Sequence, residues 1–327
     1  MSATFNISGA PIELLDIPQL LALHNMMYKF DPFILDTFFP NRAAFAAKEV
    51  PIADLKTVSP LAPFVAPLLK GQPIQDQAVA NAKFVKPAYL KPSLTITPAS
   101  AYDTALINTL RANGVIATGS GQISAADALL IDQIQKFSTN RESIDNRKIL
   151  MAVECLTTGK MVFASDDFPE YTVDYGRDAA CNFTPANEWN TAGATVVEDI
   201  EAMMQISVDK GGVLPSLILT TGKVFNAMYN DAGFKARFVT PQAGIAVPIT
   251  PAFTRTNGAQ YRGMIDGLQI WTYDAVYQDA TGSKRYIPAD YFGMISDTNG
   301  TVAQCAIQHL DVFGQPLEYY DYVVESK

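Results

Sequence analysis

The sequence has few of the residues on which metal sites and nucleophilic catalysis usually depend. It holds two histidines, His24 and His309, and the nucleophile motif Gly-x-Ser-x-Gly does not occur. Its three cysteines are scattered and have no C-x-x-C spacing: Cys155, Cys181 and Cys305. This composition argues against a histidine-rich metal site, against a disulfide scaffold and against a Ser-His-Asp type of triad.

Charged residues are also scarce, at 17% of the 327 residues, whereas about 25% is usual in a soluble domain. Hydrophobic residues make up 48% of the chain, which excludes a disordered protein. A surface with so few charges is expected to be covered in part by something other than water. The formal net charge is −9, so the whole chain does not act as a counter-charge for nucleic acid.

Long apolar runs are absent as well. No stretch of about 18 consecutive apolar residues occurs, so the sequence predicts no transmembrane helix and no membrane partner. No Lys or Arg precedes Lys29, so it predicts no secretory signal either. The expected compartment is therefore the cytoplasm, or whatever is assembled there.

Charge is unevenly distributed along the chain. The net charge is +1 over residues 1–100, −7 over residues 101–200 and −3 over residues 201–327. In a monomer such segregation usually means little, but in a self-assembling protein a basic arm of one copy can lie on the acidic body of the next. The basic part has six lysines against three acidic residues: Lys48, Lys56, Lys70, Lys83, Lys86 and Lys91 against Glu49, Asp54 and Asp76.

The N-terminal part is typical of a helix followed by an apolar arm. Residues 17–30 have apolar side chains at helical spacing, and Asp31-Pro32 ends the pattern because the residue before a proline is disfavoured in a helix. The aromatic patches that follow are too short to form a core of their own. Such an arm needs a partner surface, and its candidate contact residues are Phe30, Phe33, Ile34, Phe38 and Phe39.

Residues 50–100 contain eight prolines, which rule out a long helix. The β-rich pieces between them, at 64–69, 73–79 and 91–97, predict strands, and Leu69-Lys70-Gly71-Gln72 has the composition of a hairpin turn. The economical interpretation is a long two-stranded hairpin on proline-stiffened legs. Because a two-stranded ribbon is marginal in water alone, we expect it to be ordered only against another surface.

The rest of the chain predicts mixed helices and strands and therefore an α+β fold. Residues 124–157 predict a helix of about 33 residues, roughly 50 Å long, that would act as a strut. A β-hairpin is expected over residues 160–175, with Asp166 and Asp167 at its turn. Further expected elements are helices at 101–113, 195–208 and 221–231, strands at 216–220, 268–273 and 291–295, and a hairpin at 278–286.

Two motifs could suggest chemistry, but each has a simpler interpretation. Residues 117–122 are glycine-rich, as in phosphate-binding loops, yet they lack the Gly-x-Gly-x-x-Gly order and any Gly-Lys-Ser/Thr. The acidic run of residues 166–178 lacks the spacing of a calcium loop. We interpret the first as a plain loop and the second as a solvated hairpin or an acidic docking face. A metal-assisted hydrolase that uses the carboxylates of this run is the alternative from a different class.

The order of these parts resembles the major head proteins (capsid protein E) of phage lambda and related tailed phages, which have a Hong Kong 97-type fold. No single motif is decisive, but the collinear set is fairly specific and covers most of the chain. The set consists of Phe30-Asp31-Pro32-Phe33-Ile34-Leu35 with Phe38-Phe39, Val58-Ser59-Pro60 through Lys70-Gly71-Gln72, Val85-Lys86-Pro87-Ala88-Tyr89, Val173-Asp174-Tyr175-Gly176-Arg177, Trp189 with Asp199-Ile200-Glu201-Ala202, and Tyr261-Arg262-Gly263 leading to Tyr286-Ile287-Pro288.

The resemblance implies a capsid fold in five parts. These are an N-terminal arm at residues 1–47, an extended loop at 48–95, a peripheral domain with a spine helix and β-hairpin at 96–197, an axial domain at 198–300 and a return to the peripheral domain at 301–327. The implied function is that of a major capsid protein with no catalysis, no cofactor and no metal. An encapsulin-like compartment shell with the same fold is the alternative within the structural class.

The implied partners are first of all copies of the chain itself, which would form hexamers and pentamers of an icosahedral virion shell around double-stranded DNA. DNA would be contacted without sequence specificity, and a portal, a scaffold and a decoration protein are further expected partners. The extended loop would contact other copies through Lys56, Leu69, Lys70, Gly71, Gln72, Lys83 and Lys86. The acidic face that receives it is expected at Asp132, Glu142, Asp145, Asp166, Asp167 and Asp174.

Overall fold

The computed structural model describes residues 4–7, 10–13, 32–45, 49–58, 77–95, 125–165, 168–191, 193–239, 258–279, 281–296 and 299–305. The chain divides into two compact units, of which the first contains residues 1–41, 90–300 and 322–327. The second contains residues 42–89 and 301–321. Five expected features lie outside the described residues: the helices at 17–30 and 101–113, the strand at 64–69, the turn at 69–72 and the glycine-rich stretch at 117–122.

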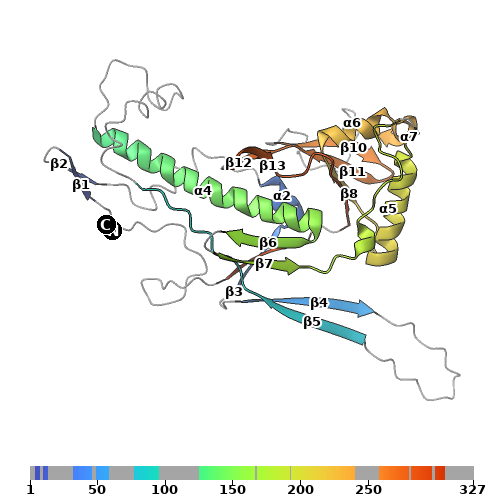
Figure 1. Cartoon of the computed structure of the whole chain (residues 1–327), viewed down its shortest axis with the longest axis horizontal. Helices are drawn as coiled ribbons and strands as arrows, with labels where there is room; N and C mark the ends of the chain where they lie inside the picture. The colour runs from blue at the N-terminus through green and yellow to red at the C-terminus, as the bar shows by residue number, and fades with distance from the viewer. Residues whose placement is uncertain are drawn as a thin grey trace. The chain divides into compact units, whose positions relative to one another are not determined.

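The first unit is built around a five-stranded sheet with the order β14-β8-β11-β10-β9. Its strands β8, β11 and β10 are labelled in Figure 1. Strands β8 and β11 run parallel, and the other neighbouring pairs are antiparallel. Every residue of β8 is buried, which fits its continuous apolar run at the middle of the sheet. The strands are β8 (Leu217–Thr220), β9 (Phe238–Val239), β10 (Ala259–Ile265), β11 (Leu268–Tyr273) and β14 (Phe292–Ile295).

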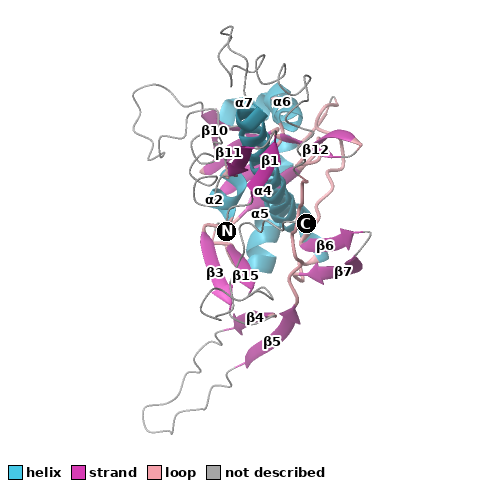
Figure 2. Ribbon diagram, turned by 90° about the vertical axis from the view of Figure 1, so that its left-hand side faces the viewer, coloured by secondary structure: helices cyan, strands magenta, loops and turns pink. Residues whose placement is uncertain are grey.

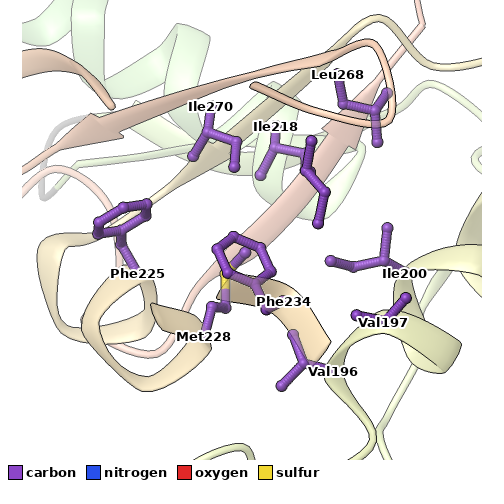
Figure 3. Packing of buried hydrophobic residues seen from close by; sticks show 10 residues of the cluster. Val196, Val197, Ile200, Ile218, Phe225, Met228, Phe234, Leu268 and Ile270 are labelled. Carbon is purple, nitrogen blue, oxygen red and sulfur yellow. The ribbon is translucent and has the colours of Figure 1, made fainter. Parts of the chain in front are cut away.

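Three helices complete the core of this sheet: α5 (Val196–Gly211), α6 (Gly222–Asn230) and α7 (Ala232–Arg237). Their inner side chains converge on those of β8 and β11, as Figure 3 shows. Local capping sets the start of the two shorter helices. The Thr221 hydroxyl accepts from the Val224 amide at 3.4 Å, and the Asp231 carboxylate accepts from the Phe234 amide at 2.7 Å.

The predicted strut is confirmed as helix α4 (Ala125–Thr158), which has 34 residues. The predicted hairpin after it is also confirmed, as β6 (Lys160–Ser165) paired with β7 (Phe168–Asp174). Phe163 and Val173 of this hairpin are buried, and β6 packs against α4. The helix is tied to the sheet region by the Tyr286 hydroxyl, which donates to the Asn146 side-chain oxygen at 2.8 Å.

The other described strands form two-stranded sheets. In the first unit β1 (Thr4–Ile7) pairs with β2 (Ala10–Glu13), and β12 (Val276–Asp279) pairs with β13 (Gly282–Arg285). In the second unit β4 (Val50–Val58) pairs with β5 (Gln77–Val85), the ribbon seen in Figure 2. Strand β3 (Asn41–Phe45), which starts at the boundary between the units, pairs with β15 (Thr301–Cys305).

Most predictions for the later part of the chain are confirmed, including the strand at 268–273 and the hairpin at 278–286. The strand predicted at 91–97 is wrong over its described residues 91–95, because these lie in no sheet and their side chains are all exposed. Helix α7 and strands β1, β2, β3, β4, β9, β10 and β15 were not predicted. Among the described residues, none of the helices combines the length and apolarity that a membrane span needs.

Candidate functional site

The apolar residues that follow Pro32 form a short helix, α2 (Phe33–Phe38), which packs within the first unit. Ile34 is buried and Phe38 is only 2% exposed. The Phe33 ring stacks on Tyr273 with a centroid distance of 5.8 Å and lies 5.1 Å from Trp271, both on β11. The expectation that these side chains need a second subunit is therefore corrected for Phe33, Ile34 and Phe38, because the chain itself supplies their partner surface.

For two other residues of the expected arm, Phe30 and Phe39, the structure does not give a buried position in the core. Phe39 is half-buried at the C-terminal end of α2, next to Gly300. Phe30 lies outside the described residues. A subunit contact of Phe30 and Phe39 thus stays a prediction.

The ribbon β4–β5 holds the longest strand pairing among the described residues. Nine residue pairs are in register, from Val50 opposite Val85 to Val58 opposite Gln77. Strand alternation places positions Lys56 and Lys83 on the same face of the ribbon. The positions of the expected turn, Leu69, Lys70, Gly71 and Gln72, lie outside the described residues.

The end of the ribbon is exposed to solvent. Phe84, the penultimate residue of β5, is 68% exposed. The next lysine along the chain, Lys86, has its ammonium 3.6 Å from the Glu49 carboxylate, and both side chains are exposed. A surface ion pair of this kind contributes little stability, so Lys86 can exchange its partner at small cost.

Of the residues expected on the acidic face, Asp132 is the one whose position in the structure does not fit a docking surface. This residue is 4% exposed, and its carboxylate lies 2.6 Å from the Lys136 ammonium one helical turn along α4. A buried carboxylate that already has a cation as partner offers no docking surface. Asp132 is therefore removed from the expected acidic face.

Two of the remaining acidic residues form ion pairs with lysines. The Asp145 carboxylate lies 3.4 Å from the Lys148 ammonium, and the carboxylate of Asp174, which is the more exposed of the two, lies 3.0 Å from the Lys160 ammonium. Burial, together with the nearby charge of Asp145, raises the pKa of Glu142 above its ordinary value. Asp166 and Asp167 lie outside the described residues, so their docking role stays a prediction.

The described carboxylates of the acidic run also serve the local backbone. Asp174 accepts from the Gly176 amide at 2.8 Å. Asp178 accepts from the Ala180 amide at 2.9 Å and so caps a short 3₁₀ helix, η2 (Ala179–Cys181). In the part of the chain that the structure describes, no three His, Cys, Asp or Glu side chains gather as a metal-binding group.

A cluster of weak acids surrounds the C-terminal end of α4. Arg177 donates to the Leu156 carbonyl at 3.4 Å and to the side-chain oxygen of Asn182. Burial raises the pKa of the Cys155 thiol although Arg177 acts against it. Burial, with the neighbouring Cys155 and Tyr171, raises the pKa of Tyr175 to about 12. At neutral pH these groups keep their protons, so they are poor nucleophiles or bases.

An exposed apolar patch at the end of α5 was not predicted. It consists of Val208, Val213 and Leu214, of which Leu214 is 60% exposed. The Ser207 hydroxyl donates to the Val213 carbonyl at 3.0 Å and so holds the turn against the helix. The sequence feature that could have indicated this patch is the apolar run that starts at Val213, before the buried strand β8 begins.

Comparison with known proteins agrees with the resemblance described above. The family described as phage major capsid protein E matches residues 16–325. The major capsid protein of Enterobacteria phage phi80 is 22% identical over 275 residues, which cover 83% of this chain and 76% of that protein. The major capsid protein of Escherichia phage lambda is 22% identical over 274 residues, with the same coverage of 83% and 76%.

A solved structure shows the likeness at the level of the fold. It is described as a capsid protein of a prophage of E. coli CFT073, and it superimposes with a TM-score of 0.57. It is 19% identical in sequence and covers 90% of this chain and 84% of its own. Since the family match spans nearly all of the sequence, the chain belongs to the phage major capsid protein E family.

Proposed function

We propose that this chain is the shell-forming subunit of a phage head and that its role is structural rather than catalytic. The observation that carries the proposal is the family match over residues 16–325. In this function, copies of the chain join as hexamers and pentamers into an icosahedral shell that encloses double-stranded DNA. The shell is part of the virion and is assembled in the cytoplasm of the host bacterium.

The fold that we assign is of the Hong Kong 97 type. Support comes from the long helix α4 with its hairpin β6–β7, from the sheet with α5, α6 and α7, and from the long ribbon β4–β5. In this assignment residues 1–47 form the arm, 48–95 the extended loop and 198–300 the axial domain. Residues 96–197 and 301–327 form the peripheral domain.

The ribbon is the element that we assign to contacts between copies. Its two strands pair only with each other among the described residues, and a two-stranded sheet is marginally stable by itself. Alternation divides its positions into two kinds of face. One face carries Lys56 and Lys83, and the other has small or apolar residues at nearly every position: Pro51, Ala53, Leu55, Ala78, Ala80, Ala82 and Phe84. The second face suits flat packing on another subunit.

Charge complementarity would set the register of that contact. The lysines of the ribbon would lie on the acidic part of a neighbouring copy, at Glu142, Asp145, Asp166, Asp167 and Asp174. Opposite charges at the rim of an interface speed association and exclude wrong registers more than they add affinity. A contact that holds a shell together should bury at least the roughly 1,600 Å² of a standard interface.

Other partners follow from the same function. DNA inside the shell meets a chain with a net charge of −9, which favours weak and sequence-independent contact. A closed head also needs a portal for DNA entry, and a scaffold and a decoration protein are further expected partners.

The test removes the ribbon without disturbing the rest of the chain. Deleting residues 60–90 would leave β4 with an unpaired edge, because β5 ends at Val85. We therefore replace residues 50–85 by a short Gly-Ser linker, which is feasible because Val50 and Val85 are directly paired. We expect this variant to stay soluble and to form no closed shells in negative-stain images, whereas the full chain forms them.

The control is the folding of the body. Because β4 and β5 pair only with each other among the described residues, the deletion variant should keep the thermal midpoint of the first unit. Normal shells from a folded deletion variant would overturn the role of the ribbon. A full chain that remains monomeric at high concentration would overturn the proposed function itself.

A further inference from the structure

The chain passes between its two units at three places within the described residues: after Asn41, after Tyr89 and after Gly300. Two of these places are joined to each other. The Asn41 amide donates to the Gly300 carbonyl at 3.2 Å, and the Gly300 amide donates to the Phe38 carbonyl at 2.9 Å. The Asn41 side chain adds a bond to the Asn299 carbonyl at 3.1 Å. These two segments therefore leave the first unit as one double connection.

The third connection has a different construction. Residues 90–95, which we call the strap, follow Tyr89 and belong to no helix or sheet. Every side chain of the strap is exposed, so burial of side chains does not hold it in place. Among the described residues, a backbone group of the strap makes its attachment to α4.

One side chain of α4 makes such an attachment. The Lys136 ammonium donates to the Thr95 carbonyl at 2.8 Å and, at the same time, to the Asp132 carboxylate at 2.6 Å. Because Asp132 is buried, it holds the ammonium at a defined point on the helix surface. The ammonium is thereby positioned to donate a hydrogen bond to the Thr95 carbonyl at the end of the strap.

We propose that Lys136 is a positioning residue that latches the strap to α4, with Asp132 as the support of the latch. While the latch is closed, the first unit holds the chain at Thr95. When it opens, residues 90–95 are released from α4 while α4 itself stays folded. In a shell subunit the latch would set how firmly the segment that follows the ribbon β4–β5 is held on α4, which goes beyond the proposed function.

Cleavage of the strap by chymotrypsin measures the latch in the full chain. The enzyme can cut after Tyr89, Leu90 and Leu94, whereas trypsin is uninformative because Lys86 and Lys91 are both followed by proline. In Lys136→Met the lost bond should raise the cleavage rate after Leu94 about tenfold, since cleavage follows the population of the open state. The matched control is Lys148→Met, which breaks the ion pair with Asp145 on the same helix and should keep the parent rate.

A second variant separates the loss of the latch from the effect of leaving a buried carboxylate without its cation. Lys136→Met leaves Asp132 buried without its cation, which can destabilise α4 by itself. The double variant Lys136→Met with Asp132→Asn opens the latch without that charge, and it should show the same faster cleavage with the thermal midpoint of the parent. Parent cleavage rates in the double variant would overturn the latch. An equal increase in Lys148→Met would also overturn it, because the effect would then be a general loosening of the helix.

Discussion

At the scale of single residues, burial decides which polar groups remain available for chemistry or contact. Asp132 has Lys136 as its partner, and the buried carboxylate of Asp199 accepts from the Trp189 indole at 2.8 Å. Each of these acids is thereby part of the internal structure rather than of the surface. Tyr291 is a similar case, since burial raises the pKa of its hydroxyl to about 12 although Arg177 acts in the opposite direction.

The shifted pKa of Tyr291 predicts a loss of stability at high pH. The unfolded chain releases this proton near pH 10 and the folded chain near pH 12, so the free energy of unfolding falls as the pH rises through this window. Tyr291→Phe removes this part of the pH dependence. One titrating group can change the free energy of unfolding by no more than about 1.4 kcal/mol per pH unit, which is the largest difference expected between the two slopes. Urea unfolding at pH 8, 10 and 11 checks the difference. A variant that loses stability as steeply as the parent between pH 10 and 11 would contradict the assignment.

At the scale of elements, the end of α4 depends on one glycine. Gly159 has a φ of +68°, and its carbonyl accepts from the Tyr175 amide at 3.1 Å, which closes the hairpin β6–β7 beside the helix. A Cβ at this position would lie 2.8 Å from the Cβ of Arg177. The helix can therefore turn directly into the hairpin only with glycine at this position.

Gly159→Ala should lower the free energy of unfolding by about 2–3 kcal/mol, because a left-handed backbone strain adds to a steric contact that cannot relax easily. Gly176→Ala is the matched control, since Gly176 has a φ of +73° but an added Cβ would meet no atom within 4 Å. It should cost only the backbone strain, about 1 kcal/mol. Equal losses in urea unfolding would show that the contact with Arg177 has no effect.

At the scale of the whole molecule, the N-terminal apolar segment is part of the body of the protein. Helix α2 places Phe38 in the core, and Phe33 extends the aromatic cluster formed by Trp271 and Tyr273 on β11. Residues that are remote in sequence thus complete one core. An assembly defect caused by truncation through this helix would therefore combine lost folding with lost subunit contact.

Phe38→Ala tests this view. The loss of a fully buried aromatic side chain should lower the free energy of unfolding of the chain by about 3–5 kcal/mol. Phe84→Ala is the control, because Phe84 is 68% exposed and its removal should change stability by less than about 0.5 kcal/mol. Denaturant unfolding followed by far-UV circular dichroism measures both. A similarly small effect of the two substitutions would restore the view that α2 is an arm for another subunit.

Several elements could be predicted from the sequence because local pattern and propensity specify them. The helical spacing over residues 124–157 predicted α4 to within one residue at each end, and the turn residues around Gly282 predicted the hairpin β12–β13. A two-stranded ribbon was also predicted, but its strands were expected at 64–69 and 73–79, whereas the observed strands are β4 (Val50–Val58) and β5 (Gln77–Val85). In each case the decisive information lies within a few residues of the element.

Other features depended on which distant segments meet. The apolar residues of α2 are the same whether they face β11 or another subunit, and the acidity of Asp132 says nothing of its burial beside Lys136. Residues 91–95 alternate as a strand does, yet they pair with none of the described strands, and the Thr95 carbonyl is bound by Lys136 instead. Local chemistry therefore set the elements of this protein, whereas long-range packing assigned its side chains to core or surface, because burial depends on partners that lie far away in the chain.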